Sequence, residues 1–144
     1  MRTLALAFAL LVVLPLTHGH AANHRVMSET ERRAIQEVIE SQLAAFQRDD
    51  GAAAFSYASP TIQRKFQSPE IFMSMVRSGY RAVYRPQQVE FRDLRLVDGV
   101  PTQEIVFVGP DNQVVTAVYL MQQQADGSWK INGVYLLKAP EAAT

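Results

Sequence analysis

The sequence predicts an α+β fold in which N-terminal helices pack on a bent, four-stranded antiparallel meander. Apolar residues recur at helical spacing in the first half of the chain, and they alternate with a period of two after Pro86. Turn signatures at Asp98-Gly99, at 109–112 and at Asp126-Gly127 then separate four strands by three hairpins. Helices that are segregated from an antiparallel sheet define the α+β class.

The first helix is expected to begin at a capping box, because Ser28 is followed three residues later by Glu31. The apolar side chains that follow share one helical face: Ile35, Val38, Ile39, Leu43 and Phe46. The acidic and glycine residues at 49–51 end this helix, and an Ala-rich helical segment is expected over 52–58.

Two further helices are expected to start at Ser59-Pro60 and Ser68-Pro69. In each pair the serine serves as the N-cap and the proline occupies the first turn. Gly79 is expected to end the second of these helices as a left-handed C-cap.

The first strand is expected to contain a β-bulge. Val89 and Phe91 alternate in one parity, whereas Leu94 and Leu96 alternate in the opposite parity. The slip falls at Arg92-Asp93, and such an extra residue bends a strand. The remaining strands are expected at 102–108, 114–122 and 129–137.

Residues 1–21 are expected to form a cleaved signal peptide, so the protein is expected to be exported to a periplasm or to the extracellular medium. The apolar run over 4–16 is only 13 residues long, too short for a helix that crosses ~30 Å of hydrocarbon. We place the cut after Ala21, with a cut after Ala22 as the alternative. An uncleaved membrane anchor is the alternative to cleavage; after cleavage we expect no stable membrane span.

The remaining chain is expected to form a single α+β domain over 28–138, between flexible tails at 22–27 and 139–144. Cleavage would leave 13 basic against 14 acidic side chains, so nucleic acid is not an expected partner. The sequence has no cysteine, which excludes disulfides, thiolate metal sites and a lipid-modified cysteine anchor. It has no nucleotide-binding or common hydrolase motif either, and no cofactor is expected.

Four segments carry a resemblance to a known family: QLAAFQRDD at 42–50, SPTI at 59–62, MVRSGY at 75–80 and VYRP at 83–86. They resemble domain-of-unknown-function family 4864, a family of uncharacterised exported bacterial proteins. The closing DGSWKINGV at 126–134 is similar to the last hairpin and strand of the nuclear transport factor 2-like superfamily, also called SnoaL-like or cystatin-like. That resemblance implies a cone whose open end is commonly a ligand pocket. Members of the superfamily include isomerases, dehydratases, plain binding modules and dimerisation domains.

The resemblance implies that an enzyme of this superfamily would use a His or Asp as acid or base, often with a tyrosine. His24 precedes the first helix, so a histidine base inside the cone is not expected. Glu104, in an otherwise apolar strand, and Asp93, at the bulge, are the carboxylates considered as catalytic bases. The alternative is that Glu104 is a solvated residue on the outer face and Asp93 simply the bulge residue.

The stretch from Arg77 to Pro86 is expected to lie near the mouth of the cone, and it suggests a ligand site. Its arginines could hold a carboxylate or phosphate while its tyrosines line an apolar body. The candidate ligand-binding residues are Tyr57, Arg77, Tyr80, Tyr84 and Arg85. The alternative is that Tyr80 and Tyr84 pack on the core and that the arginines are solvated or pair with Asp49 and Asp50.

His24 is also the candidate metal ligand. A cut after Ala21 would leave Ala22-Asn23-His24 at the new N-terminus, where the amine, two backbone nitrogens and the imidazole can bind Cu(II) or Ni(II) in a square plane. The alternative is an incidental histidine in a flexible tail.

Our leading hypothesis is a non-catalytic module that binds a small ligand or a protein partner, so we do not expect an enzyme. The second hypothesis is a small isomerase or lyase with a carboxylate base in the cone. The third is a structural module that forms a homodimer through the sheet, because both faces of the third strand are apolar. One face carries Val115, Ala117, Tyr119 and Met121, and the other carries Val114, Val118 and Leu120.

Overall fold

The computed structural model describes residues 25–137. The signal peptide predicted for 1–21, its cut after Ala21, the candidate metal ligand His24 and the tail predicted for 139–144 lie outside the described residues. Met27 is 5% exposed and packs in the core, so the packed part of the chain already includes a residue before Ser28.

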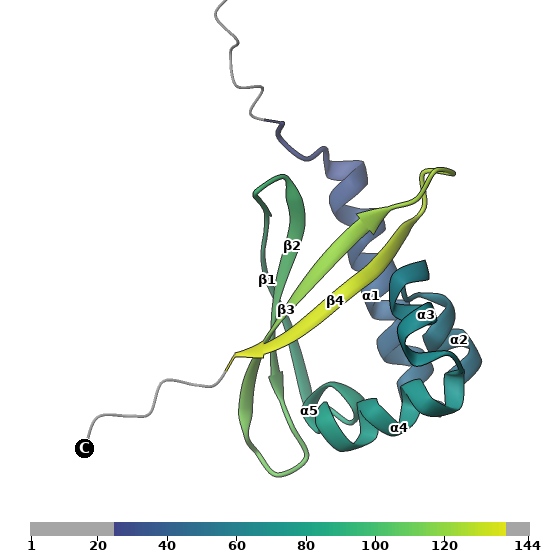
Figure 1. Ribbon diagram of the computed structural model, residues 1–144. Coiled ribbons are helices and arrows are strands. Elements are labelled where there is room, and N and C mark those ends of the chain that lie inside the picture. Colours follow the sequence, from purple (N-terminus) through teal and green to yellow (C-terminus); the bar gives the residue numbers. More distant parts are fainter. Residues whose placement is uncertain (1–24, 138–144) are drawn as a thin grey trace, which may run out of the picture.

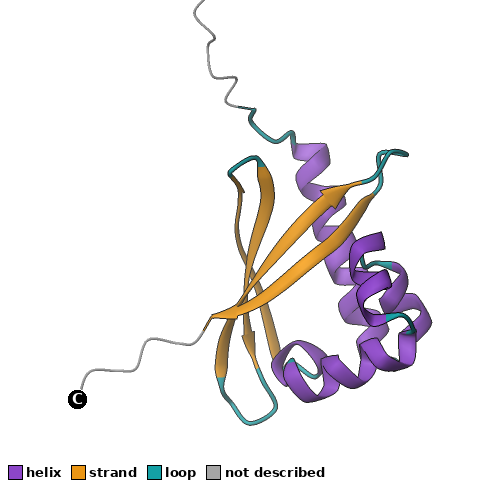
Figure 2. Cartoon of the chain, in the orientation of Figure 1, coloured by secondary structure: helices purple, strands orange, loops and turns teal. Residues whose placement is uncertain are grey.

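Five helices precede four strands in the described chain (Figure 1). The helices are α1 (Glu29–Gln47), α2 (Gly51–Ser56), α3 (Pro60–Phe66), α4 (Pro69–Gly79) and α5 (Arg81–Tyr84). The strands are β1 (Gln88–Val97), β2 (Val100–Val108), β3 (Val114–Gln123) and β4 (Trp129–Leu137). The strands form one antiparallel sheet in the order β1-β2-β3-β4, and the helices lie on one side of it (Figure 2). The predicted α+β class and the meander are confirmed.

Helix α1 begins at the predicted capping box. The Ser28 hydroxyl accepts from the backbone N–H of Glu31 at 3.2 Å, and the Ser28 N–H donates to the Glu31 carboxylate at 2.9 Å. Ile35 and Ile39, one turn apart, are fully buried, and each contributes about 1.5–3 kcal/mol of hydrophobic stabilisation. The apolar face of α1 thus fixes the helix against the sheet, where it packs on β4.

The end of α4 differs from the prediction. Gly79 is the last residue of the helix and not a left-handed cap, because Tyr80 takes the cap position at φ −132° and the chain enters α5 at once. The N–H of Tyr80 still donates to the carbonyl of Val76 at 2.9 Å. Positive φ occurs instead after α1, at Asp49, and after α3, at Gln67.

Two irregularities shape the sheet. The predicted bulge in β1 is confirmed, because the register with β2 shifts between Phe91 and Leu94. A second shift occurs between β3 and β4, where Leu120 pairs with Gly133 and Met121 pairs with Ile131. Asn132 is therefore an extra residue in β4, and bulges of this kind increase the local bend of a sheet.

The turn between α2 and α3 is hydrogen-bonded to this second bulge. The N–H of Ser59 donates to the carbonyl of Ile131 at 2.8 Å, and the N–H of Ile131 donates to the carbonyl of Tyr57 at 2.9 Å. The fully buried Ser59 hydroxyl donates to the side-chain oxygen of Asn132 at 2.7 Å. These bonds attach the start of α3 to β4.

The core lies between the helices and the inner face of the sheet. Residues alternate along the central strands: Ile105, Phe107, Ala117 and Tyr119 are buried, whereas Glu104, Val106, Val118 and Leu120 are only half-buried. The second set therefore forms the outer face. None of the helices within residues 25–137 is long and apolar enough to cross a membrane.

Candidate ligand-binding cavity

A cavity of ≈ 210 Å³ lies between the helices and strands β3 and β4, and it opens to solvent. Most of its lining is apolar: Phe46, Ala58, Ile62, Phe66, Phe72, Met75, Val76, Val83, Gly133 and Val134. The remaining lining residues are polar or amphipathic: Gln42, Lys65, Tyr80, Tyr119, Asn132 and Tyr135. Neither group contains a carboxylate or a histidine, so an apolar occupant suits this cavity better than a cationic one.

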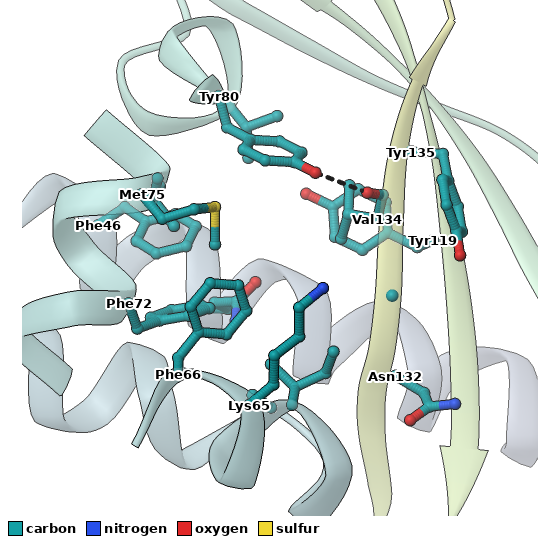
Figure 3. Close-up of a pocket in the computed structure, with 16 residues that line it drawn as sticks. Phe46, Lys65, Phe66, Phe72, Met75, Tyr80, Tyr119, Asn132, Val134 and Tyr135 are labelled. Atoms are coloured by element: carbon teal, nitrogen blue, oxygen red, sulfur yellow. Dashed lines mark hydrogen bonds between the residues drawn. The ribbon is translucent and has the colours of Figure 1, made fainter. Parts of the chain in front are cut away.

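Three phenylalanines and a methionine form the wall on the helical side (Figure 3). Phe72 is the centre of the aromatic cluster, with ring centroids 6.3 Å from Phe46 and 5.8 Å from Phe66. Met75 lies one turn further along α4, so its side chain occupies the same helical face as Phe72. Because Met adapts its shape easily, it suits a wall that must accommodate a guest.

The sheet side of the cavity carries two tyrosine hydroxyls. Tyr80 donates its hydroxyl hydrogen to the carbonyl of Val134 in β4 at 3.0 Å (Figure 3). Tyr119 lies on β3 directly opposite Val134 in the register. Both tyrosines therefore meet the same residue of β4.

The Tyr119 hydroxyl is unusual. The residue is 0% exposed, and its hydroxyl has no hydrogen-bond partner among residues 25–137. Burial raises the pKa of Tyr119 above its ordinary range, and Tyr80 raises it further, so the group stays a neutral donor at physiological pH. An unpaired buried hydroxyl costs about 1–3 kcal/mol, which is why such groups are rare.

Lys65 supplies the positive charge of the lining. Its side chain is exposed at the cavity mouth and its ammonium lies 5.6 Å from the centre of the Phe66 ring. In the described part of the chain no carboxylate pairs with it, whereas six other ion pairs form. Figure 3 shows its amino group pointing into the cavity, on the side of Tyr80 and Tyr119.

The predicted ligand-binding residues lie at three different sites in the structure. Only Tyr80 lines this cavity. Tyr57 lines a second, more open groove of ≈ 310 Å³ between α1 and the β3–β4 hairpin, together with Val38 and Trp129 among others. The two sites share no lining residue.

Arg77, Tyr84 and Arg85 converge on Asp49 instead of on a cavity. The Tyr84 hydroxyl donates to one Asp49 oxygen, and Arg85 donates to the other at 2.9 Å. Arg77 lies 3.6 Å from the first oxygen. The hydrogen bond from Tyr84 is the largest cause that lowers the pKa of Asp49, and the charges of Arg85 and Arg77 lower it further. This geometry matches the alternative interpretation, in which the arginines pair with an acid at the end of α1.

The two candidate catalytic carboxylates lie away from the cavity. Glu104 pairs with Val118 on the outer face of the sheet, with its neighbours Gln103 and Ile105 buried on the inner face. Asp93 is exposed at the β1 bulge. No group of three or more metal-binding side chains occurs within residues 25–137.

Tyr119 and Lys65 are two polar residues of the lining that sequence reasoning missed. The sequence pattern places Tyr119 on an apolar face of the third strand, where a buried tyrosine hydroxyl needs a hydrogen-bond partner. A tyrosine at such a position was the available signal for a polar group in the cavity. Lys65 had no signal of its own, because its place at the mouth depends on how α3 is attached to β4.

A model of one protein family matches residues 28–144, and its description is "Domain of unknown function (DUF4864)". The match includes every helix and strand of the structure. No curated protein matches the chain. Every residue that lines the cavity lies within the matched range.

Proposed function

The chain belongs to the family described as Domain of unknown function (DUF4864), and we propose that it is a non-catalytic module that binds a small, mostly apolar molecule in the cavity between helices and sheet. The observation that carries this proposal is the unpartnered hydroxyl of the fully buried Tyr119. A ligand atom that accepts a hydrogen bond would remove the cost of this unpaired donor. The cavity is therefore better suited to an occupant with one acceptor than to a purely hydrocarbon one.

The residues around the cavity support binding and give no support to catalysis. An isomerase or lyase needs a base within hydrogen-bond reach of the substrate. The lining contains no Asp, Glu or His, and the two candidate bases, Glu104 and Asp93, lie on other surfaces. Tyr119, with its raised pKa, is a donor and not a base at neutral pH.

The size of the cavity limits the ligand. An engineered cavity of about 150 Å³ binds benzene, so ≈ 210 Å³ suits a six-membered ring with a few additional heavy atoms. A ligand of roughly ten heavy atoms would bind with a dissociation constant of about 10 μM to 1 mM.

We propose in addition that the bent sheet and the helices form the cone of the nuclear transport factor 2-like superfamily, with the cavity at its open end. The two strand irregularities, at 91–94 and at Asn132, support a strongly bent sheet.

We also propose that the module works after export, on the basis of the short apolar run over 4–16. N-terminal sequencing of the protein from its own host tests the export proposal; an intact Met1 would contradict it.

A pair of isosteric probes tests ligand binding. Acetophenone carries a carbonyl oxygen that can accept from Tyr119, and α-methylstyrene replaces this oxygen by a methylene group. We expect acetophenone to bind about five- to tenfold more tightly in calorimetry, the value of one ordinary hydrogen bond. Tyr119→Phe should abolish the preference.

A cavity-filling variant provides the second arm of this experiment. Met75→Trp places a large ring in the cavity and should abolish binding of both probes. Ile71→Trp makes a similar change on the same helix, but Ile71 is 52% exposed and outside the lining, so binding should persist. Binding that survives Met75→Trp, or no binding to the unmodified protein at millimolar concentrations, would refute the proposal.

A second candidate function is self-association through the outer face of the sheet. It is favoured by three exposed apolar side chains on or beside that face: Val114 at 55%, Tyr135 at 60% and Leu137 at 50% exposure. Sedimentation equilibrium tests this candidate. A dimer that Leu137→Glu dissociates would support it, because Leu137 does not line the cavity, and a monomer at high concentration would exclude it.

A further inference from the structure

We infer that the cavity selects an apolar monocarboxylate, with the carboxylate held by Lys65 and Tyr119 and the apolar body against the phenylalanine wall. This inference rests on the proposed binding function and names the chemical class of its ligand. It is drawn from the distribution of donors and charge around the cavity.

The lining contains one positively charged side chain and no acidic side chain to neutralise it. Lys65 is its single formal charge, and the cavity mouth offers no Asp or Glu. Two cations at the far end of the helical layer behave differently, since Arg77 and Arg85 both pair with Asp49. Arg64, next to Lys65, makes no ion pair in the described residues either, but it does not line the cavity. An ammonium that has no acidic partner within the described ranges, beside an apolar cavity, favours an anion over a neutral or cationic ligand.

The two tyrosine hydroxyls on the sheet side and the Lys65 ammonium on α3 can all donate hydrogen bonds. The Tyr80 hydroxyl hydrogen is already used by the carbonyl of Val134. The Tyr119 hydroxyl hydrogen is unused, and the Lys65 ammonium has donors to spare. A carboxylate accepts through two oxygens and can satisfy both groups at once, which a single carbonyl oxygen does less well.

The apolar groups lie opposite these donors. Figure 3 shows the rings of Phe66 and Phe72 and the thioether of Met75 on the helical side, across the cavity from the tyrosine hydroxyls. This separation matches a molecule with one ionised end and one hydrocarbon end. The ≈ 210 Å³ volume suits a body the size of a phenyl ring on a short chain.

The experiment compares 3-phenylpropanoate with its neutral isostere 3-phenylpropanamide, by calorimetry at pH 7 with the full protein. The two probes have the same shape, and only the acid carries a charge. We expect the carboxylate to bind about tenfold more tightly at low salt, and the preference to shrink as salt is added, because Lys65 is exposed.

Lys65→Met removes the charge and keeps the apolar stem. This variant should lose the preference for the acid while its affinity for the amide stays unchanged. Arg64→Met is the matched control, because Arg64 is the adjacent exposed cation on α3 and does not line the cavity. It should keep the preference.

The outcomes separate the inference from the function on which it rests. Equal affinity for acid and amide, or a preference that Lys65→Met leaves intact, would overturn the inference and leave the proposed function standing. If neither probe nor acetophenone binds the unmodified protein, the proposed function itself fails.

Discussion

Tyr80 and Tyr119 meet at one residue of β4, and only Tyr80 is hydrogen-bonded there. Val134 accepts from the Tyr80 hydroxyl at 3.0 Å and lies directly opposite Tyr119 in the sheet register. The Tyr119 hydroxyl, although fully buried, has no partner in residues 25–137. We therefore expect the Tyr80 hydroxyl to stabilise the fold through its hydrogen bond, and the unpaired Tyr119 hydroxyl to destabilise it.

Replacing Tyr119 by Phe is expected to stabilise the ligand-free protein by about 1 kcal/mol, because the change removes an unsatisfied buried hydroxyl. Urea unfolding measures this as a higher midpoint with an unchanged slope. A lower midpoint would mean that the hydroxyl has a partner inside the folded protein, and the proposed ligand contact would lose its basis.

Tyr80→Phe is the matched comparison, and its expected effect has the opposite sign. It removes the hydrogen bond to Val134 and leaves that carbonyl unpaired, so the free energy of unfolding should fall by about 1 kcal/mol. Each variant lacks one hydroxyl oxygen that the unmodified protein has. Equal effects of both substitutions would contradict the assignment of their hydrogen bonds.

Ser59 is expected to matter more than an ordinary helix cap. Its hydroxyl caps α3 through the N–H of Ile62 and also donates to Asn132 at 2.7 Å, from a fully buried position. Ser59→Ala should therefore cost about 2 kcal/mol, against about 1 kcal/mol for Ser68→Ala, whose hydroxyl only caps α4. Thermal unfolding of the two variants compares them directly. A smaller loss in Ser59→Ala would show that the hydrogen bond from Ser59 to Asn132 adds no stability.

Asp49 is expected to make the stability depend on acidic pH. Its pKa is lowered in the folded state, first by the hydrogen bond from Tyr84 and then by Arg85 and Arg77. A lowered carboxyl pKa contributes stability above the ordinary value of about 3.9, and this contribution disappears as the pH falls below it.

The gap in unfolding free energy between the unmodified protein and Asp49→Asn should be constant near neutral pH and should narrow as the pH falls below about 4. Denaturant unfolding across this range measures it. Asp93→Asn, at an exposed site that makes no ion pair in the described structure, should leave the neutral-pH stability unchanged. A gap that widens in acid would contradict the Asp49 network.

Local sequence signals predicted most of the fold. The capping box at Ser28, the bulge after Phe91 and the hairpin at Asp98-Gly99 each depend on neighbouring residues, and each is confirmed. The second bulge could have been predicted in the same way, because the alternation of apolar residues shifts by one position between Ile131 and Val134. The Gly79 cap was wrong, since the position of the next helix, and not the glycine, decided the backbone there.

The site was harder to predict than the fold. The four-residue spacing within the arginines (77, 81 and 85) and within the tyrosines (80 and 84) suggested a ligand site at the junction of helices and sheet. Spacing alone, however, does not tell which of these side chains face inward. Asp49, distant in sequence, binds Tyr84 and both flanking arginines, and this leaves Tyr80 at the cavity. No local sequence pattern predicts that Asp49, which is distant in sequence, binds these side chains.

The most direct test of the account is a map of amide chemical shifts during titration with acetophenone. We predict that the largest changes fall on residues that line the cavity, with Tyr80, Tyr119 and Val134 among them, and that Met75→Trp removes these changes. Changes centred on the groove at Tyr57 and Trp129, or on the outer sheet face at Val118, would contradict the central claim that this cavity is the ligand site.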